Sequence, residues 1–560
     1  MNKKYMLIDD VPCEFADEKN VLEVIRKANI DLPTFCYYSE LSTYGACRMC
    51  VVEDKWGNVQ ASCSSVPKEG MEIYTNTERL RKYRKSILEL LLSNHCRDCV
   101  CCEKSGNCKL QDLAEKFGIR KVRFENNYAN VPIDDSSCAI VREQSKCILC
   151  GDCVRMCKEI QNVGAIDFVN RGSHMRVSTP FDEPLAKGVC VSCGQCAVIC
   201  PTGALTIKSD KEKLWKAIDD ENKKVIVQIA PAVRVGIGKA LGLASGQNYM
   251  GQIVAALRKM GVDEIYDTST GADFTVIEEA KELIERIENN KVMPMFTSCC
   301  PSWINYLEKN HPEFLPNVST CRSPIQMLGS VIKEHNKGSE KKVVSVAIAP
   351  CTAKKFECQR DEFKINGEDT VDIVITTVEL IEMIREACIE FDKIAPEGVD
   401  QLFGNNSGAG VIFGVTGGVT EAVARTIVED KSKKEFDKIS FSGVRGLEGI
   451  KEAELVYKDK TLKIAIVSGL KNAEIILEQI KSGEKHYDFM EVMTCPSGCI
   501  GGAGQPLVKS SSRHKKVEGL FESDRMNPVK HSGANHVTKE LYATTLKDKE
   551  HELLHVSYIK

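Results

Sequence analysis

The sequence predicts a multidomain protein in which cysteine-rich α+β domains precede a large α/β domain with parallel sheets. The chain has 560 residues, more than one hydrophobic core usually accommodates. Nineteen of its 27 cysteines lie before residue 201. Beyond residue 225, buried strand-like runs such as "VIVQIAP" and "VVSVAIAP" alternate with amphipathic helices, which is the pattern of α/β domains.

Composition excludes several classes of protein. The net charge is −4 without a basic tract, so we expect no nucleic-acid partner. The apolar run near the start covers only residues 5–8, too short for a secretory signal, and no run is long enough for a membrane span. We therefore expect a cytoplasmic protein with no membrane partner. The cysteines occur in C-x2-C pairs in a large chain, which favours metal ligands over a disulfide scaffold.

Residues 1–78 begin with a predicted hairpin in "YMLIDDVPCEF", a helix in "NVLEVIRKANI" and a cysteine-rich loop. This order is expected of a small ferredoxin-like β-grasp domain. Four cysteines follow a C-x10-C-x2-C-x12-C pattern: Cys36, Cys47, Cys50 and Cys63. Such a set suits a [2Fe–2S] centre with a longer first loop than the plant type, and a zinc site is the alternative.

Residues 79–126 start with a basic helix, "ERLRKYRKSILELLL", and continue into "HCRDCVCCEKSGNC". His95, Cys99, Cys102 and Cys108 form an H-x3-C-x2-C-x5-C pattern, which fits a [4Fe–4S] cluster or a Cys3His zinc site. Its place in a row of cluster motifs favours the cluster, and it leaves Cys96 and Cys101 as spare thiols.

Residues 127–209 contain one motif twice, C-x2-C-x2-C-x3-C. Three thiolates of such a motif bind one cube and the fourth reaches the other cube. The first predicted [4Fe–4S] set is Cys147, Cys150, Cys153 and Cys200. The second is Cys190, Cys193, Cys196 and Cys157. Paired zinc ribbons fit this rhythm poorly. Several redox centres on one chain imply an electron-transfer chain that leads to a catalytic site.

Residues 210–506 form the predicted catalytic domain, in which three segments bring thiols to strand ends. They are "FTSCCPSW", "APCTAKKFE" and "EVMTCPSGCIGGAGQP". Active sites of α/β folds lie at such ends, and four thiolates there fit another [4Fe–4S] cube. Residues 507–560 form a tail with helical stretches. Its "HELLH" matches a zinc-protease motif, but it ends too near residue 560 for a further ligand, so we expect a surface helix packed on the catalytic domain.

These three segments resemble the signature motifs of [FeFe]-hydrogenases, and the N-terminal cysteine layout is similar to that of the large monomeric clostridial type. The resemblance implies reversible reduction of protons to H2 in anaerobic metabolism. It also implies an H-cluster, which is a [4Fe–4S] cubane joined to a di-iron subsite with CO, cyanide and azadithiolate. Ferredoxin or flavodoxin is the implied redox partner, and maturation proteins supply the di-iron subsite.

The resemblance also assigns residues. The implied cubane ligands are Cys300, Cys351, Cys495 and Cys499, the last of which bridges to the di-iron subsite. Lys354 faces one cyanide, and the backbone at Ala230 and Pro231 faces the other. Met493, Phe413 and Ser323 complete the expected cofactor pocket.

The implied proton path comprises Cys299, Glu279, Ser319, Glu282 and Arg286. Independently of the resemblance, Glu279, Glu282 and Arg286 are spaced to share one helix face, although a solvated charged face has the same spacing. Cys300 would then be the ligand of the cysteine doublet, and Cys299 would stay protonated.

Several positions depart from the common family pattern: Ala232, Ile325, Ala349, Ala503 and the segment "STCRSP". They surround the expected cofactor and leave catalytic bias open. Two alternatives, a cluster-bearing NADH dehydrogenase subunit and an iron–sulfur assembly factor, fit the three motifs and the complete ligand sets less well. A catalytic subunit of an NADH-linked bifurcating complex stays open.

Overall fold

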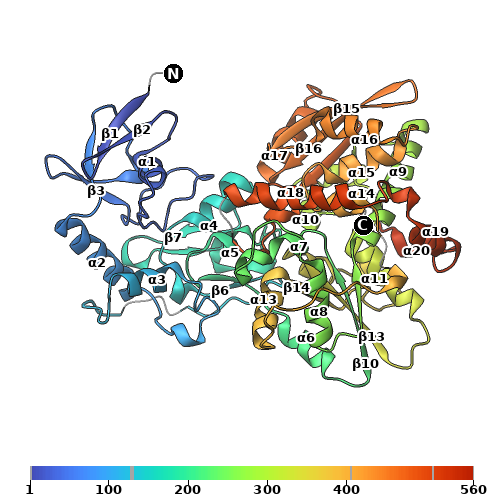
Figure 1. Ribbon diagram of the computed structural model, residues 1–560, viewed down its shortest axis with the longest axis horizontal. Helices are drawn as coiled ribbons and strands as arrows, with labels where there is room; N and C mark the ends of the chain where they lie inside the picture. The colour runs from blue at the N-terminus through green and yellow to red at the C-terminus, as the bar shows by residue number, and fades with distance from the viewer. Residues whose placement is uncertain (1–2, 127–130, 404–405, 508–509, 559–560) are drawn as a thin grey trace. The chain divides into compact units, whose positions relative to one another are not determined.

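The computed structural model describes residues 3–126, 131–403, 406–507 and 510–558 (Figure 1). The chain divides into two compact units. The N-terminal unit contains residues 1–160, 164–188 and 196–206, and the C-terminal unit contains residues 161–163, 189–195 and 207–560. The expected domain boundary at residue 127 lies outside the described residues. Within the part of the chain that is described, no helix combines the length and apolarity that a membrane crossing requires.

The N-terminal unit starts with a five-stranded mixed sheet in the order β2-β1-β5-β3-β4. The strands are β1 (Lys4–Ile8), β2 (Val11–Phe15), β3 (Val51–Asp54), β4 (Val59–Ala61) and β5 (Glu72–Tyr74). The predicted β1–β2 hairpin is confirmed, and β1 pairs in parallel with β5. Helix α1 (Val21–Lys27) buries four apolar side chains in this core, and Asn20 caps it by accepting the Glu23 amide. This is the expected β-grasp arrangement.

Helix α2 (Glu78–Ser93) is tied to this sheet by a buried arginine. Arg84 donates to the carbonyl oxygens of Met49, Val51 and Thr75, so its charge is solvated by backbone dipoles. The rest of the unit contains short elements between cysteine loops. They are α3 (Lys109–Lys116), α4 (Asp152–Arg155), β6 (Ile140–Arg142), β7 (Asp167–Val169), β8 (Arg176–Ser178) and β9 (Leu205–Ile207). Helix α5 (Gln195–Ile199) carries the chain between the units.

The first sheet of the C-terminal unit is fully parallel, as predicted, in the order β11-β10-β13-β14. Its strands are β10 (Lys223–Ile229), β11 (Glu264–Asp267), β13 (Lys342–Ala349) and β14 (Ile373–Thr376). Helices α8 (Met250–Lys259) and α13 (Thr377–Glu386) cover one face. Helices α9 (Ser269–Glu288) and α11 (Pro324–His335) cover the other. Covering both faces explains why the strands are continuously apolar.

The second sheet has the order β12-β17-β16-β15 and differs from the prediction at one edge. Strands β12 (Met295–Phe296), β17 (Phe489–Met493) and β16 (Lys460–Ser468) are parallel. Strand β15 (Ile450–Tyr457) pairs antiparallel with β16 through a tight hairpin. Alternate residues of β15 are buried and exposed, because only one face of this strand is covered.

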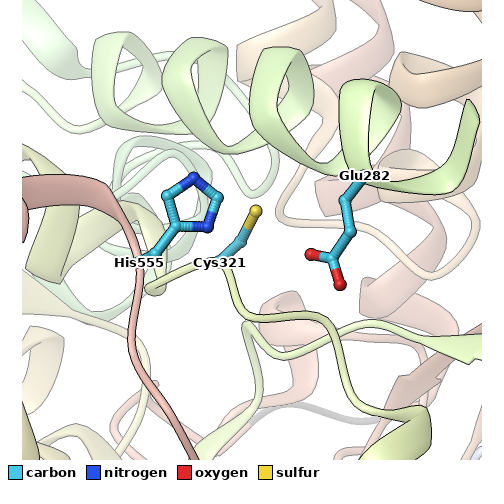
Figure 2. A group of neighbouring side chains, drawn as sticks. All are labelled: Glu282, Cys321 and His555. Atoms are coloured by element: carbon cyan, nitrogen blue, oxygen red, sulfur yellow. The ribbon is translucent and has the colours of Figure 1, made fainter. Parts of the chain in front are cut away.

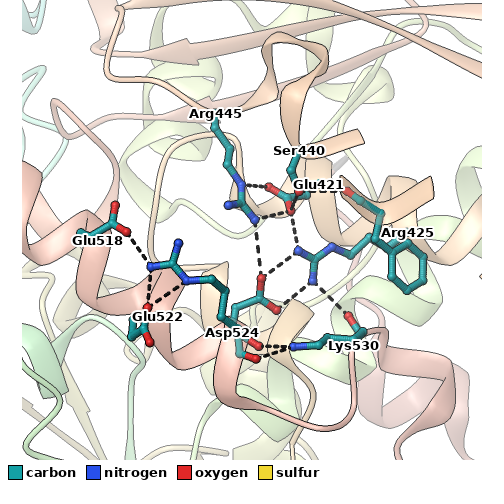
Figure 3. Close-up of polar contacts among 10 residues, drawn as sticks. Glu421, Arg425, Ser440, Arg445, Glu518, Glu522, Asp524 and Lys530 are labelled. Carbon is teal, nitrogen blue, oxygen red and sulfur yellow. Dashed lines mark hydrogen bonds and ion pairs between the residues drawn. The ribbon is translucent and has the colours of Figure 1, made fainter. Parts of the chain in front are cut away.

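The C-terminal tail is helical, as expected, with α18 (Ser510–Met526), α19 (His536–Ala543) and α20 (Glu550–Leu554). A buried ion-pair network anchors α18 (Figure 3). Asp524 accepts hydrogen bonds from Arg425, which also contacts Glu421 of the same helix α15 (Gly418–Ile427). Arg445 contacts both acids. Because these carboxylates are buried and fully paired, loss of one partner would leave an uncompensated charge.

Candidate active site and cluster sites

One cavity in the C-terminal unit brings together most of the residues predicted to hold the H-cluster. It has a volume of about 80 Å³. Its walls come from loops that follow β10, β12, β13 and β17, so it lies where parallel strands end. Ten predicted residues line it: Ala230, Pro231, Cys299, Cys300, Cys351, Lys354, Phe413, Met493, Cys495 and Cys499. Three of the unusual residues, Ala232, Ile325 and Ala349, also line it.

Glycines allow two cysteine loops to approach each other closely. A Cβ on Gly502 would lie 2.1 Å from the Pro350 carbonyl oxygen, and a Cβ on Gly504 would lie 3.0 Å from the Cys351 amide nitrogen. The segment after Cys499 therefore packs directly on the backbone beside Cys351. The unusual Ala503 does not line the cavity; its Cβ faces Gly194 of the segment 189–195.

Four half-buried thiols converge in this cavity and fit an iron–sulfur cube. The pKa of Cys495 is raised well above its ordinary value by burial and by the neighbouring Cys351, Cys300 and Cys499. Such crowding of soft donors is unfavourable without a cation and is what a cubane requires. The side-chain amide of Gln195 donates from Nε2 to Cys495 Sγ at 3.3 Å and to the Gly501 carbonyl oxygen at 3.0 Å. The sequence prediction had not included Gln195.

Lys354 places a buried cation beside the thiols. Its Nζ lies 2.9 Å from both carboxylate oxygens of Glu357 and 3.1 Å from the Cys299 carbonyl oxygen. Burial opposes the charge, but Glu357 outweighs it and keeps the pKa of Lys354 raised. Ser323 is not among the lining residues; its hydroxyl donates to Glu357 at 2.9 Å. The structure thus places Ser323 behind Lys354 rather than in the cavity.

The predicted proton-path residues begin at this cavity with Cys299 and Glu279. Burial and the adjacent Glu279 raise the pKa of Cys299 well above its ordinary value. Burial and the charge of Glu282 raise the pKa of Glu279 to about 8. Neither oxygen of Glu279 has a hydrogen-bond partner of normal geometry among the described residues, although the Ser298 amide lies close enough to lower that pKa slightly. A carboxyl in this setting is protonated at neutral pH.

Glu282 continues the row toward the surface. Its Oε2 accepts from the Ser319 hydroxyl at 2.9 Å, and its Oε1 accepts from Arg286 at 2.6 Å. Thr320 also donates to Oε2, through its amide at 2.9 Å and its hydroxyl at 3.1 Å, a contact that the sequence prediction missed. Because Glu279 and Arg286 are buried, the alternative of a solvated charged helix face is wrong.

The N-terminal unit presents the sulfur sets of the predicted accessory clusters. In the first set, the Cys47 amide lies 3.3 Å from Cys36 Sγ and the Phe35 amide lies 3.4 Å from Cys47 Sγ. Interaction with the partner thiol lowers the pKa of Cys47 to about 6 and that of Cys50 to about 7. Amide donors that point at sulfur stabilise thiolates, as a [2Fe–2S] centre requires.

His95 has the surroundings of a metal ligand. Burial lowers the pKa of this imidazole to about 4, so it is neutral. Its Nδ1 is buried without a hydrogen-bond partner among the described residues, while the Lys146 backbone contacts the ring. A histidine that binds a metal usually has one ring nitrogen free for the metal, while a hydrogen bond to a carbonyl orients the other. Gly203 lets the chain approach a second member of this set, since a Cβ there would lie 2.7 Å from Cys102 Sγ.

The first repeated motif surrounds a small cavity of about 20 Å³. All four predicted ligands line it: Cys147, Cys150, Cys153 and Cys200. Burial raises the pKa of Cys147 to about 12, which a bound cluster would reverse. The other predicted set comprises Cys190, Cys193, Cys196 and Cys157. That set stays a prediction.

Family comparisons agree with this architecture. The model for the iron only hydrogenase large subunit, C-terminal domain, matches residues 223–503, and that for the iron hydrogenase small subunit matches residues 510–560. Upstream, a 2Fe-2S iron-sulfur cluster binding domain matches residues 5–78. The iron-sulfur binding region of NADH-ubiquinone oxidoreductase-G matches residues 84–123, and a 4Fe-4S dicluster domain matches residues 146–204.

Two relatives match this chain along their whole length. The chain is 38% identical to the NADP-reducing hydrogenase subunit HndD of Solidesulfovibrio fructosivorans, covering 100% of this chain and 99% of that one. It is 34% identical to iron hydrogenase 1 of Clostridium pasteurianum, with 100% of both chains covered. A solved structure of [FeFe]-hydrogenase HydA1 from Chlamydomonas reinhardtii matches with a TM-score of 0.56 at 36% identity, covering 63% of this chain and 99% of that chain.

The chain therefore belongs to the [FeFe]-hydrogenase family, as a large subunit with N-terminal iron–sulfur domains. It is an oxidoreductase that acts on H2, with an iron–sulfur relay leading to an H-cluster domain.

The buried carboxyl of Glu279 gives a pH-dependent prediction. Its pKa of about 8 lies above the ordinary 4.5, so the folded protein holds this proton more tightly than the unfolded chain. The stability that this group contributes to the folded protein is fully present below pH 4.5 and is lost as the pH rises through about 8.

Infrared difference spectra of protein with isotope-labelled glutamate should show a buried carboxylic-acid band that disappears as the pH rises through about 8. Glu279→Gln should remove the band, whereas Glu285→Gln, on the exposed side of α9, should retain it. A band unchanged in Glu279→Gln would contradict this assignment.

Proposed function

We propose that this hydrogenase reversibly reduces protons to H2 and exchanges electrons with ferredoxin, or flavodoxin, through one [2Fe–2S] and three accessory [4Fe–4S] clusters. The observation that carries the proposal is the cavity in which four thiols meet beside Lys354. An H-cluster bound there would supply the redox-active iron at which protons and electrons combine. Its di-iron part requires maturation proteins, and we place the enzyme in the cytoplasm.

The residues that line the cavity would bind the H-cluster, orient its ligands and exclude water. Cys300, Cys351, Cys495 and Cys499 would hold the cubane, and Cys499 would also hold the di-iron subsite. Lys354 and the backbone at Ala230 and Pro231 would orient the diatomic ligands, since a buried ammonium favours an anionic acceptor. Met493 and Phe413 are both buried on the cavity wall, where they exclude water.

Electrons would arrive through the segment 189–195, which carries Cys190 and Cys193. Gln195 in this segment donates to Cys495 Sγ, and the Thr352 hydroxyl donates to the Ser192 carbonyl at 3.0 Å. These bonds fix a predicted cluster loop against two cysteine loops of the cavity. A short protein path of this kind supports direct transfer between the last accessory cluster and the cubane.

Protons would move along the other side. The proposed order is Cys299, Glu279, then Ser319 with Glu282, and finally Arg286 at the outer end. The protonated state of the buried Glu279 supports it, because a neutral acid can both give and receive a proton beside a thiol. The Ser319 hydroxyl links to Glu282 by its 2.9 Å hydrogen bond.

Replacing the inner thiol tests this path. Cys299→Ala should keep the iron content and lower turnover by at least about 100-fold, since a positioned proton donor contributes roughly 100- to 10,000-fold. H2 production from a reduced dye measures turnover, and metal analysis measures iron. Cys388→Ser, which changes an exposed thiol, is the control and should keep full activity. Full activity in Cys299→Ala would refute the shuttle role.

An NADP-linked complex is the second candidate, because one full-length relative is named as a subunit of an NADP-reducing hydrogenase. The purified chain can be assayed for H2 production with reduced ferredoxin and, separately, with NADPH. We expect reduced ferredoxin alone to support turnover by the single chain. Activity that requires NADPH and co-purified subunits, with none from ferredoxin, would favour the complex instead.

A further inference from the structure

Three ligand-type side chains meet at the outer end of the proposed proton path and belong to none of the predicted cluster sets. Glu282 lies on α9, Cys321 in the segment before α11, and His555 directly after α20 (Figure 2). One ligand atom of each lies within 4.8 Å of the other two. A carboxylate, a thiol and an imidazole from three separate segments form a ligand set typical of Zn²⁺.

The backbone holds the cysteine and the histidine in place. Cys321 and His555 form an isolated antiparallel bridge. On either side of it, the Arg322 amide donates to the Leu554 carbonyl at 2.8 Å and the Val556 amide donates to the Thr320 carbonyl at 2.7 Å. Leu553 and Leu554 are buried in the core beside α11, so the end of the chain is fixed there. The arrangement is therefore built by the fold and does not depend on two mobile side chains.

The remaining contacts of these side chains suit a metal site. His555 faces Thr320 Oγ1 with Nδ1 at 2.9 Å and Glu278 Oε2 with Nε2 at 3.3 Å. Whichever nitrogen binds a cation, the other keeps a partner that orients the ring. Cys321 is fully buried, whereas the side chains of Glu282 and His555 are 11% and 13% exposed. A cation can thus enter from the side of Glu282 and His555.

We propose that Glu282, Cys321 and His555 bind a zinc ion, or a similar thiophilic divalent cation, that inhibits H2 turnover by occupying the outer proton relay. On binding, the Cys321 S–H bond breaks, a sulfur–metal bond forms and the proton leaves to solvent. The neutral imidazole and the carboxylate contribute lone pairs, no electrons are transferred, and water fills the fourth position. The inhibition rests on the proposed role of Glu282 in proton transfer; the binding does not.

The cation would act on Glu282 in two ways. It takes a carboxylate oxygen that otherwise receives protons, and it adds positive charge to a group that already contacts Arg286. Both effects lower the basicity of the carboxylate, so a proton is received there less readily. Occupying the site should therefore slow turnover without changing the cofactor or the accessory clusters.

Direct binding tests the site without relying on activity. Cluster-loaded enzyme is dialysed to equilibrium against Zn²⁺ alone, and zinc and iron are measured together. We expect one zinc per chain with iron unchanged, and affinity reduced more than about 100-fold in Cys321→Ala and in His555→Gln, because even outer partners of metal ligands alter affinity by about 10- to 100-fold. Cys388→Ser and His486→Gln, which change exposed residues, should bind zinc as the unaltered chain does. Absence of this zinc, or equal binding by Cys321→Ala, would overturn the site.

Turnover tests the inhibition separately. Each protein is assayed with and without Zn²⁺, and the ratio of the two rates is compared. At a zinc concentration that saturates the site, the rate with zinc should be at least about tenfold lower than the rate without zinc for the unaltered chain and the two controls. For Cys321→Ala and His555→Gln, the two rates should be nearly equal. Zinc that binds without slowing the unaltered chain would overturn the inhibition. A chain that produces no H2 even without zinc would instead refute the proposed function, and the dialysis result would still decide the site.

Discussion

The crowding of four half-buried cysteine thiols beside one buried lysine in a single apolar cavity is the constraint on which the catalytic half depends. Thiols crowded in this way are costly, as the raised pKa of Cys495 reflects. A bound cluster removes that cost by taking them as thiolates, and Lys354 balances part of the resulting charge. The lysine is itself held by Glu357, whose second support is Ser323. The thiolates are thus balanced by Lys354, Lys354 is held by Glu357, and Glu357 is held by Ser323.

The same cavity gives the two adjacent cysteines different surroundings. Cys299 and Cys300 both line it, so direction alone does not separate them. Their surroundings do: Cys300 Sγ lies 3.3 Å from the Thr494 hydroxyl, next to Cys495, whereas Cys299 borders the buried Glu279. These surroundings support the proposal that Cys300 binds the cubane and Cys299 passes protons.

Much of this architecture could be predicted because it depends on spacing along the chain. The spacing of the cysteines predicted the cluster sets, and thiols placed directly after predicted strands indicated the position of the cavity. What depends on distant partners could not be read from spacing. The antiparallel edge strand β15, the donation of Gln195 to Cys495 and the position of Ser323 behind Lys354 all follow from tertiary packing. Similarly, only the fold brings His555 of "HELLH" to Cys321 and Glu282.

Infrared spectroscopy can decide whether the four-thiol cavity holds an H-cluster. The chain is produced together with maturation proteins, and the stretching bands of iron-bound CO and cyanide are recorded beside the electron paramagnetic resonance signals of the accessory clusters. We expect these bands in the unaltered chain and their loss in Cys499→Ala, with the accessory signals retained. Iron-loaded protein without CO and cyanide bands after maturation, or bands unchanged in Cys499→Ala, would contradict it.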